Sequence, residues 1–365
     1  MHRGAVAEID RSALLNNLRT IQARIGYKPV IAVVKADAYG HGSVEIARAL
    51  VTQGADLLAV AFVEEARLLR SFGIEAKILV LFDQSDISAC FDLNLIPVLH
   101  DKNSAAAFSH EARKRRKPLP VHIKIDTGMG RMGFRAEAGV RDILEIANLE
   151  GLVLEGLLSH FSEADLADKT FAIHQVDLFR EIHAEVVRRT GGMLVRHMAN
   201  SAAIFSLPDA VLDAVRPGIA LYGYSSSDES FGLEPVMKIK TKVLSVRSLP
   251  AGTPVSYGRT FVTKRDSRIA VVSLGYADGY NRLFSNNAEM LVGGHRVPVV
   301  GRVCMDLTML DVTEAGHVSE GDEVVVLGSQ DGQVITATEL SRRIGTIPYE
   351  VLTSLGSRSR REYIH

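Results

Sequence analysis

The stretch VIAVVKADAYGHGSVEIARALVTQGADLLAVAF, residues 30–62, contains one complete unit of the predicted fold. It begins with five apolar residues and continues, after a Gly-containing turn, into SVEIARALVTQG (43–54), whose apolar positions recur every three or four residues. It ends in a second apolar run, LLAVAF (57–62). Two buried strands joined by an amphipathic helix are typical of a parallel βα unit, so the stretch predicts an α/β fold.

The same alternation continues to about residue 222. The further strand-like runs are KILVLF (77–82), LIPVL (95–99), PVHIKI (120–125), LVLEGLL (152–158), LVRHM (194–198) and an eighth at either 211–215 or 219–222. Amphipathic helical patterns such as HQVDLFREIHAEVVRR lie between them. Eight such units in succession predict a closed (β/α)8 barrel of the TIM type.

The pattern changes after residue 232. The strand-like segments VMKIKTKVLSVRSLP (236–250), RIAVVSLGY (268–276) and GDEVVVLGS (321–329) are separated by turns rich in Gly, Pro and Asp. We therefore expect two domains: a barrel of residues 1–232 and a mainly-β domain of residues 233–365.

Composition excludes several classes of function. Apolar residues make up 47% and charged residues 23% of the 365 residues, and the net charge is -1, which favours a small-molecule ligand over nucleic acid or a membrane surface. The start has no signal-peptide pattern and no apolar run is long enough to span a bilayer, so we expect a cytoplasmic protein. Cys90 and Cys304 are too few for a disulfide framework and have no metal-ligand spacing, so no metal is expected.

Polar residues follow the predicted barrel strands at their carboxyl ends, where barrel active sites are built. The first strand ends in Lys35, and the others lead to Lys124, Arg131, His160, Asn200, Ser201, Arg216 and Gly218. Each has a structural explanation when taken alone, but the fold places all of them at one mouth. The pattern therefore predicts an active site there.

Eight motifs in order resemble those of alanine racemases. In the first half these are KPVIAVVKADAYGHG (28–42), IDTGMGRMGF (125–134), HMANSAA (197–203) and VRPGIALYG (215–223). In the second half they are PVSYGRTF (254–261), GYADGY (275–280), GRVCMDLTMLDV (301–312) and TIPYE (346–350). The resemblance covers essentially the whole chain.

The resemblance implies an isomerase that interconverts L-alanine and D-alanine by a two-base mechanism on the external aldimine of pyridoxal 5'-phosphate, supplying D-alanine for peptidoglycan. Lys35 is then the catalytic lysine that carries the cofactor as a Schiff base and serves one face of the substrate. Tyr257 serves the other face from the β domain of a second subunit, so the resemblance also implies a homodimer with shared active sites.

The resemblance assigns further roles at the site. Arg216 faces the pyridine nitrogen and, as a permanent cation, keeps it unprotonated. Arg131 and Met305 bind the substrate, and Lys124, a position that is often carbamylated in the family, positions Arg131. The other cofactor-binding residues are Tyr39, His160, Asn200, Ser201, Gly218, Ile219 and Tyr349, and the pocket is completed by Tyr276 and Asp306.

Four alternatives stay open at this point. Gly128, Gly130 and Gly133 form a G-x-G-x-x-G pattern, but it lies in the fifth barrel unit and contains Arg131, which disfavours a nucleotide cofactor. A barrel-type decarboxylase needs an acidic partner for the pyridine nitrogen, and Arg216 is against it. A broad-specificity racemase is usually exported, and the lack of a signal-peptide pattern is against it. A pyridoxal phosphate carrier resembles the barrel alone, so the β domain with Tyr257 and Met305 favours an enzyme.

The chain departs from the family pattern at three places. Phe82 follows ILVL where a glycine is usual, the opening AVAEID lacks the usual tryptophan, and the tail GSRSRREY differs from the common form. None of these removes a catalytic position. They leave the breadth of substrates open. Leu81, beside the altered Phe82, is a further candidate contact in the pocket.

Overall fold

The structure is a computed structural model, and it describes residues 4–55, 57–225 and 229–365. These residues form two compact units. The barrel unit contains the described residues of 15–38 and 43–234, and the sheet unit contains those of 4–14, 39–42 and 235–365. Each unit is described separately below.

The barrel unit is built on parallel strands. In order, each pairing with the next, they are β2 (Ile31–Val33), β3 (Leu57–Val60), β4 (Lys77–Val80), β5 (Ile96–Leu99), β6 (Leu119–Asp126), β8 (Leu152–Leu158) and β9 (Val195–His197). A short strand, β7 (Phe134–Arg135), pairs only with β6. These strands coincide with the apolar runs, because a parallel strand covered on both faces must be apolar along its length.

An eighth segment, residues 213–217, closes the barrel. Ala214 forms a parallel bridge with His197 of β9, and Val215 forms one with Val30, just before β2. On the β2 side, the amide of Ile31 donates to the carbonyl of Val215 at 2.9 Å. The eighth strand is therefore the 211–215 alternative, whereas Ile219–Tyr222 forms a 3-10 helix. The predicted barrel is confirmed.

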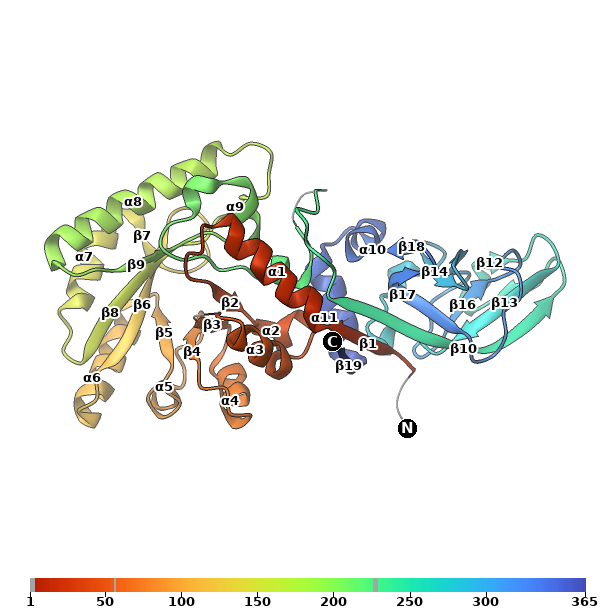
Figure 1. Cartoon of the computed structure of the whole chain (residues 1–365), viewed down its shortest axis with the longest axis horizontal. Coiled ribbons are helices and arrows are strands. Elements are labelled where there is room, and N and C mark those ends of the chain that lie inside the picture. Colours follow the sequence, from red (N-terminus) through yellow and green to blue (C-terminus); the bar gives the residue numbers. More distant parts are fainter. Residues whose placement is uncertain (1–3, 56, 226–228) are drawn as a thin grey trace. The chain divides into compact units, whose positions relative to one another are not determined.

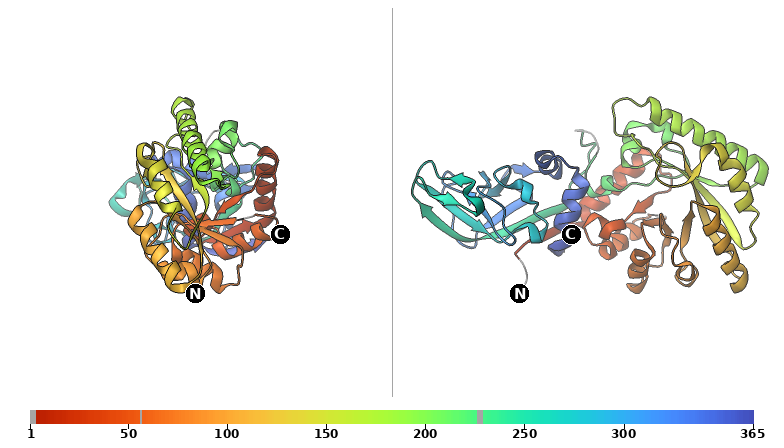
Figure 2. Two further views of the ribbon diagram at one scale, coloured as in Figure 1. Left: turned by 90° about the vertical axis from the view of Figure 1, so that its left-hand side faces the viewer. Right: turned by 180° about the vertical axis from the view of Figure 1, so that it is seen from behind.

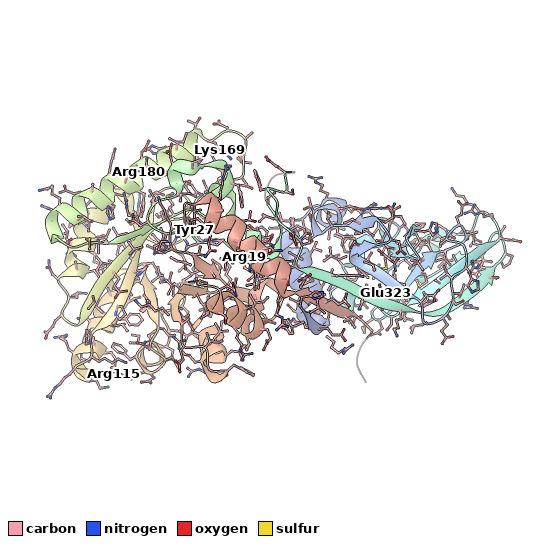
Figure 3. All side chains as sticks on the ribbon, in the orientation of Figure 1. Arg19, Tyr27, Arg115, Lys169, Arg180 and Glu323 are labelled. Atoms are coloured by element: carbon pink, nitrogen blue, oxygen red, sulfur yellow. The ribbon has the colours of Figure 1, made fainter. Side chains whose placement is uncertain are left out.

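The helices that follow the strands lie on the outer side of the barrel (Figures 1 and 2). They are α3 (Ser43–Thr52), α4 (Val63–Ser71), α5 (Ile87–Asp92), α6 (Lys102–Arg115), α7 (Ala136–Ala147) and α8 (Thr170–Thr190), with the short α9 (Ser201–Ser206) after β9. The charged side chains of Arg115 on α6 and Arg180 on α8 lie on this outer side (Figure 3). This leaves the carboxyl ends of the strands to form the mouth.

The sheet unit is mainly β, as expected. Its long strand β10 (Met237–Leu249), blue-green in Figure 1, pairs with β17 (Glu323–Gln330) and β13 (Ser267–Val272). The other elements are β11 (Pro254–Val255), β12 (Phe261–Val262), β14 (Glu289–Val292), β15 (His295–Pro298), β16 (Thr308–Asp311), β18 (Gln333–Ile335), β19 (Arg360–Ile364), α10 (Ala337–Ile344) and α11 (Pro348–Arg358).

The N-terminal strand β1 (Val6–Asp10) departs from the expected division of the chain. It pairs antiparallel with β10 and parallel with β19, so it belongs to the sheet unit although its residues precede the barrel. The physical reason is its alternating pattern: Ala7 and Ile9 are buried while the residues between them are partly exposed. Such a period of two suits a strand with one covered face. Helix α1 (Arg11–Arg24) follows it.

No helix in the described part of the chain is both long enough and apolar enough to cross a membrane.

Candidate active site

Lys35 lies two residues after the end of β2, at the barrel mouth. Its Nζ is 5.3 Å from the centre of the Phe82 ring, and the guanidinium of Arg131 is 5.5 Å from the same ring. Burial and the charge of Arg131 lower the pKa of Lys35, and the carboxylate of Glu65 opposes this in part. A lysine with a lowered pKa is more often an unprotonated, nucleophilic amine at neutral pH. The site therefore favours imine chemistry at Lys35.

Arg216, in the closing segment, is a deeply buried cation of the site. It is 5% exposed, and its guanidinium donates to the carbonyl of Ser159 at 2.6 Å, to Nδ1 of His197 at 2.9 Å and to Nδ1 of His160 at 3.3 Å. Burial lowers its pKa to about 10, which still leaves it charged at neutral pH. Its partners are neutral carbonyls and imidazoles, so its positive charge is not cancelled by direct contact.

Two buried histidines, His197 and His122, continue the hydrogen bonding of Arg216 into the barrel interior. Nε2 of His197 lies 2.8 Å from Nδ1 of His122. Nδ1 of His197 accepts a hydrogen bond from Arg216. The ring proton of the neutral His197 is therefore on Nε2, which donates to Nδ1 of His122. Gly156 on the neighbouring strand makes room, since a Cβ there would lie 2.8 Å from the His122 ring. Arg216, His197 and His122 thus form one chain of donors running in a single direction.

Sequence reasoning missed both His122 and His197 as parts of the site. A signal existed for His122: it lies two residues before Lys124 on the same strand, so the two side chains share a face. His197 is the first residue of the motif HMANSAA, from which only Asn200 and Ser201 were selected. A histidine within an apolar strand is more often structural, and that general tendency concealed both residues.

The depressed pKa values of these histidines predict a loss of stability in mild acid. Burial lowers the pKa of His122 to about 4 and that of His197 well below its usual range. In the unfolded chain a histidine takes up a proton near pH 6.5, so stability is fully present above that pH and is lost as the pH falls toward 4. Between pH 6.5 and 5 the unfolding free energy of the wild type should therefore fall by roughly 1.6 kcal/mol more than that of His122→Asn, which lacks this protonation.

Urea unfolding at a series of pH values measures this decline. The control is His295→Asn, which changes an exposed histidine and should leave the slope of the wild type. Equal slopes for His122→Asn and wild type would contradict the prediction. The slope is compared rather than the absolute stability, because the variant also loses a hydrogen bond to His197.

The segments after β9 and after the closing strand contact each other through Ser201. Its hydroxyl accepts from the amide of Gly218 at 2.9 Å and from that of Ala220 at 3.2 Å. The side chain of Asn200 caps α9 by accepting from the amide of Ala203 at 3.0 Å. Ile219, which begins the following 3-10 helix, is buried. The structure thus brings these four predicted residues together at one edge of the mouth.

Lys124 lies on β6 and is 4% exposed. Its pKa is lowered to about 8, first by burial and then by the charges of Arg216 and Arg131, while Asp126 acts in the opposite direction. Arg131 itself is exposed on the loop after β6. Lys124 is therefore a buried amine held among other cations, and about one tenth of it is neutral at pH 7.

The glycine-rich loop after β6 is folded around Asp126. One carboxylate oxygen of Asp126 accepts from the amide of Gly128 at 3.0 Å and from that of Gly130 at 3.1 Å. A Cβ at Gly133 would lie 2.9 Å from the Asp126 amide, so this position requires glycine. Amides already bound to a carboxylate are not a cradle for pyrophosphate, which agrees with the interpretation of this motif as the Arg131 loop.

The remaining predicted residues lie in the sheet unit. Tyr257 follows β11, is 69% exposed, and borders a hollow of about 400 Å³ that is also lined by Val255 and Leu307. The carbonyl of Met305 accepts from the amide of Ala277 at 2.9 Å, which joins the Met305 segment to the turn that begins at Tyr276.

Three further residues complete the predicted set. The rings of Tyr39 and Tyr349 are 5.7 Å apart. Asp306 is exposed next to Met305. No group of three or more metal-ligating His, Cys, Asp or Glu side chains occurs among residues 4–55, 57–225 and 229–365.

Comparison with known proteins identifies the family. The sequence model of the N-terminal domain of alanine racemase matches residues 9–226, and that of its C-terminal domain matches residues 236–363. The alanine racemase of Thermodesulfovibrio yellowstonii is 49% identical over 369 residues, covering 100% of this chain and 99% of that protein. The chain belongs to the alanine racemase family. The resemblance drawn from the eight motifs is therefore confirmed.

Solved structures of alanine racemases have the same fold. That of Streptomyces coelicolor A3(2) has a TM-score of 0.94 at 36% identity and covers 99% of this chain and 98% of its own. That of Bacillus anthracis with bound L-Ala-P has a TM-score of 0.92 at 35% identity, covering 100% and 96%. That of Bartonella henselae with covalently bound pyridoxal phosphate has a TM-score of 0.89 at 32% identity, covering 99% of each chain.

Proposed function

We propose that this protein is an isomerase that interconverts L-alanine and D-alanine with pyridoxal 5'-phosphate as its cofactor. The observation that carries the proposal is the barrel mouth, where Lys35 has a lowered pKa and the buried Arg216 contacts His160. Membership of the alanine racemase family over the whole chain supports the substrate.

The residues at the mouth fit pyridoxal phosphate. An aldehyde condenses with an unprotonated amine, and the lowered pKa of Lys35 increases the fraction of that form. Arg131 and Arg216 add positive charge near Lys35, which suits an anionic cofactor. The covalently bound pyridoxal phosphate of the Bartonella henselae alanine racemase supports the assignment.

Within this proposal, Lys35 holds the cofactor covalently. Arg216, with His160 as a neighbour, would interact with the pyridine nitrogen of the cofactor. Its phosphate is bound by hydroxyls and amides, which are the donors that phosphates prefer. The residues proposed for this role are Tyr39, Ser201, Gly218, Ile219 and Tyr349, and Asn200 is proposed as a further cofactor-binding residue.

The cofactor, when bound, withdraws electrons from the amino acid and so weakens its Cα–H bond. The charge of Arg216 would disfavour a proton on the pyridine nitrogen and would thereby limit this withdrawal. A site with moderate electron withdrawal suits the transfer of one proton and disfavours side reactions such as transamination. A decarboxylase of the same fold needs an acidic partner at this place, and each hydrogen-bond partner of Arg216 is neutral.

Racemisation requires one acid/base group on each face of Cα. Lys35 serves one face in this proposal and Tyr257 serves the other. Arg131 binds the substrate carboxylate, and Met305 binds the substrate through its backbone amide. Tyr276 and Asp306 line the entrance, where a narrow pocket would favour alanine over larger amino acids.

The proposed functional unit is a homodimer. Residues 1–232 form the cofactor-binding domain, and residues 233–365 contribute Tyr257 to the active site of the partner subunit. The exposure of Tyr257, at 69%, and of Met305, at 54%, supports this, because two such side chains in one chain suit a surface that another subunit covers. The strand β1 is the exception to the division at residue 232.

Lys124 is proposed to be carbamylated. Its pKa near 8 leaves a useful neutral fraction of the amine, which reacts with carbon dioxide to give a carbamate anion and a proton. An anion here is attracted to Arg131 and Arg216, whereas an unmodified ammonium is repelled by them. We expect Lys124→Ala to reduce kcat/KM about tenfold, the equivalent of about 1.4 kcal/mol, with partial rescue by added acetate.

The carbamate is detected directly by carbon NMR after growth or incubation with 13C-labelled bicarbonate. Wild type should give a carbamate carbonyl resonance that Lys124→Ala lacks. Lys102→Ala, at an exposed lysine on α6, is the control that should retain it. A spectrum without this resonance in the wild type would reject the modification.

The proposed role is the supply of D-alanine for peptidoglycan. A D-alanine auxotroph carrying this gene should grow without added D-alanine. A cytoplasmic location stays a prediction, which fractionation of the producing cells tests.

The function itself is tested with purified protein supplied with pyridoxal phosphate and L-alanine in D2O. We expect optical rotation to fall to zero while deuterium replaces the Cα proton. Release of carbon dioxide from another amino acid would instead indicate a decarboxylase. Cofactor binding without turnover of any amino acid would indicate a carrier.

A further inference from the structure

The four residues after Lys35 adopt an unusual backbone conformation. In α2 (Lys35–Tyr39), Ala36, Asp37 and Ala38 have φ angles of 51°, 53° and 52°, and that of Tyr39 is 55°. None of them is glycine. Left-handed helical backbone is strained for L-residues, so four in succession require strong support from their surroundings.

Two carboxylates supply part of that support. Asp37 holds the end of the turn, since its Oδ1 accepts from the amide of Ser43 at 2.7 Å. Glu65, on the first turn of α4, holds its beginning. Oε1 of Glu65 accepts from the amide of Ala36 at 2.6 Å. Ala36 is the residue directly after Lys35, so this contact acts on the backbone from which the Lys35 side chain extends.

The other oxygen of Glu65 is bound to the segment that directly follows β3, the next strand of the barrel. Oε2 accepts from the amide of Ala61 at 2.6 Å and from that of Phe62 at 3.1 Å. The contact with Phe62 is the usual one of a glutamate in the third position of a helix. The contact with Ala36 is additional to that role. One carboxylate therefore joins the carboxyl ends of β2 and β3 at the mouth.

Each of these three contacts uses a backbone N–H group as the donor. An ionised carboxylate can accept all three, whereas an amide of the same size would place an NH2 group against one or two N–H groups. Glutamine therefore cannot replace Glu65 without losing either the Ala36 contact or the contacts on the β3 side. The arrangement specifically requires the anion.

We propose that Glu65 is a positioning residue of the active site, which holds the left-handed turn and thereby places the Lys35 amine at the mouth. The proposal deepens the proposed function, since it assigns the group that prepares Lys35 for its task. Glu65 also acts through its charge on Lys35. The other groups that interact with the Lys35 amine are Arg131, the ring of Phe82, and the neutral His160.

The test compares Glu65→Gln with Glu64→Gln. Glu64 is the neighbouring residue on α4, and it pairs at the surface with Arg67 at 3.0 Å, so its replacement changes the net charge equally without touching the mouth. Both variants, and the wild type, are freed of pyridoxal phosphate. The acetylation of Lys35 is then followed by mass spectrometry of its peptide over a range of pH.

We expect the labelling midpoint of Lys35 in Glu65→Gln to move about one pH unit toward acid, because the nearby anion is lost. With the cofactor restored, kcat for alanine racemisation should fall about 10- to 100-fold, since the amine is misplaced, while KM changes less. Glu64→Gln should match the wild type in both measurements. A labelling midpoint or a kcat for Glu65→Gln equal to that of Glu64→Gln would overturn the proposal.

Glu65→Asp covers the case in which Glu65→Gln fails to fold. Aspartate keeps the charge and suits the first turn of a helix, but it is one methylene too short to reach both strands. Its kcat should also fall at least about tenfold, and wild-type kcat would overturn the proposal. The labelling needs no turnover, so a protein that does not racemise alanine would reject the proposed function while leaving this measurement of Glu65 intact.

Discussion

Lys35→Ala is expected to abolish racemisation of alanine, with a loss of kcat/KM of at least about 10⁴-fold, because it removes both the covalent attachment of the cofactor and one of the two acid/base groups. The lowered pKa of Lys35 and its place just beyond the carboxyl end of β2 support this expectation. Turnover is measured by chiral chromatography of the alanine product. Reduction with borohydride measures the attachment, which should link pyridoxal phosphate to the wild type and not to the variant.

Lys28→Ala is the matched control. Lys28 lies before the same strand, at the opposite end from Lys35, and its Nζ donates to the carbonyl of Val211 at 2.9 Å. It should retain borohydride-stable cofactor and near wild-type turnover. If Lys35→Ala kept the covalent cofactor, another lysine would hold it, and the assignment of Lys35 would be wrong.

Tyr257→Phe is expected to lower racemisation about 10²- to 10⁴-fold, the usual effect of removing one general acid or base. The two enantiomers have equal free energy in water, so kcat/KM must fall equally in both directions. The difference between directions should appear in proton exchange instead. With Lys35 intact, one enantiomer should still exchange its Cα proton with D2O without inversion, and the other should not.

Proton NMR measures the exchange, and chiral chromatography measures the inversion. Tyr27→Phe, at a tyrosine that is 79% exposed in the barrel unit (Figure 3), is the control and should behave as the wild type. Racemisation by Tyr257→Phe at the wild-type rate would end the two-base scheme. Slow exchange of both enantiomers to the same extent would show that the two faces are not divided between Lys35 and Tyr257.

A mixture of the two inactive variants tests whether the active site is shared. If Tyr257 serves the partner subunit, a heterodimer of Lys35→Ala and Tyr257→Phe contains one intact site. Random exchange of subunits should then restore about one quarter of wild-type activity. If Tyr257 serves its own chain, every site in the mixture lacks one group and no activity returns.

Local patterns in the sequence were sufficient for the barrel. Its strands are short, continuous apolar runs, and the helices between them have a clear period, so eight units could be counted before the fold was known. Because the carboxyl ends of parallel barrel strands share one mouth, Lys35, His160 and Arg216 could be placed together from their positions at strand ends alone. The pairing of Arg216 with His160 agrees with that placement.

Other features could not be predicted from local patterns. The strand β1 was expected with the barrel that follows it, yet its partners β10 and β19 lie more than 200 residues away in the chain. The choice between 211–215 and 219–222 as the eighth strand also depended on a distant partner, the segment at Val30. The role of Glu65 likewise depends on a contact between two segments, since one carboxylate oxygen accepts from the amide of Ala36 and the other from that of Phe62.

By itself the sequence determined the barrel, the mainly-β second unit, the family and the residues at the ends of the strands, because periodicity and motifs are properties of neighbouring residues. Only the tertiary structure decided which buried groups contact each other. His122 and His197 are 75 positions apart and meet at 2.8 Å because two strands of the closed barrel place them on the same inner face. Such contacts depend on strand register and barrel closure, which no local pattern of residues specifies.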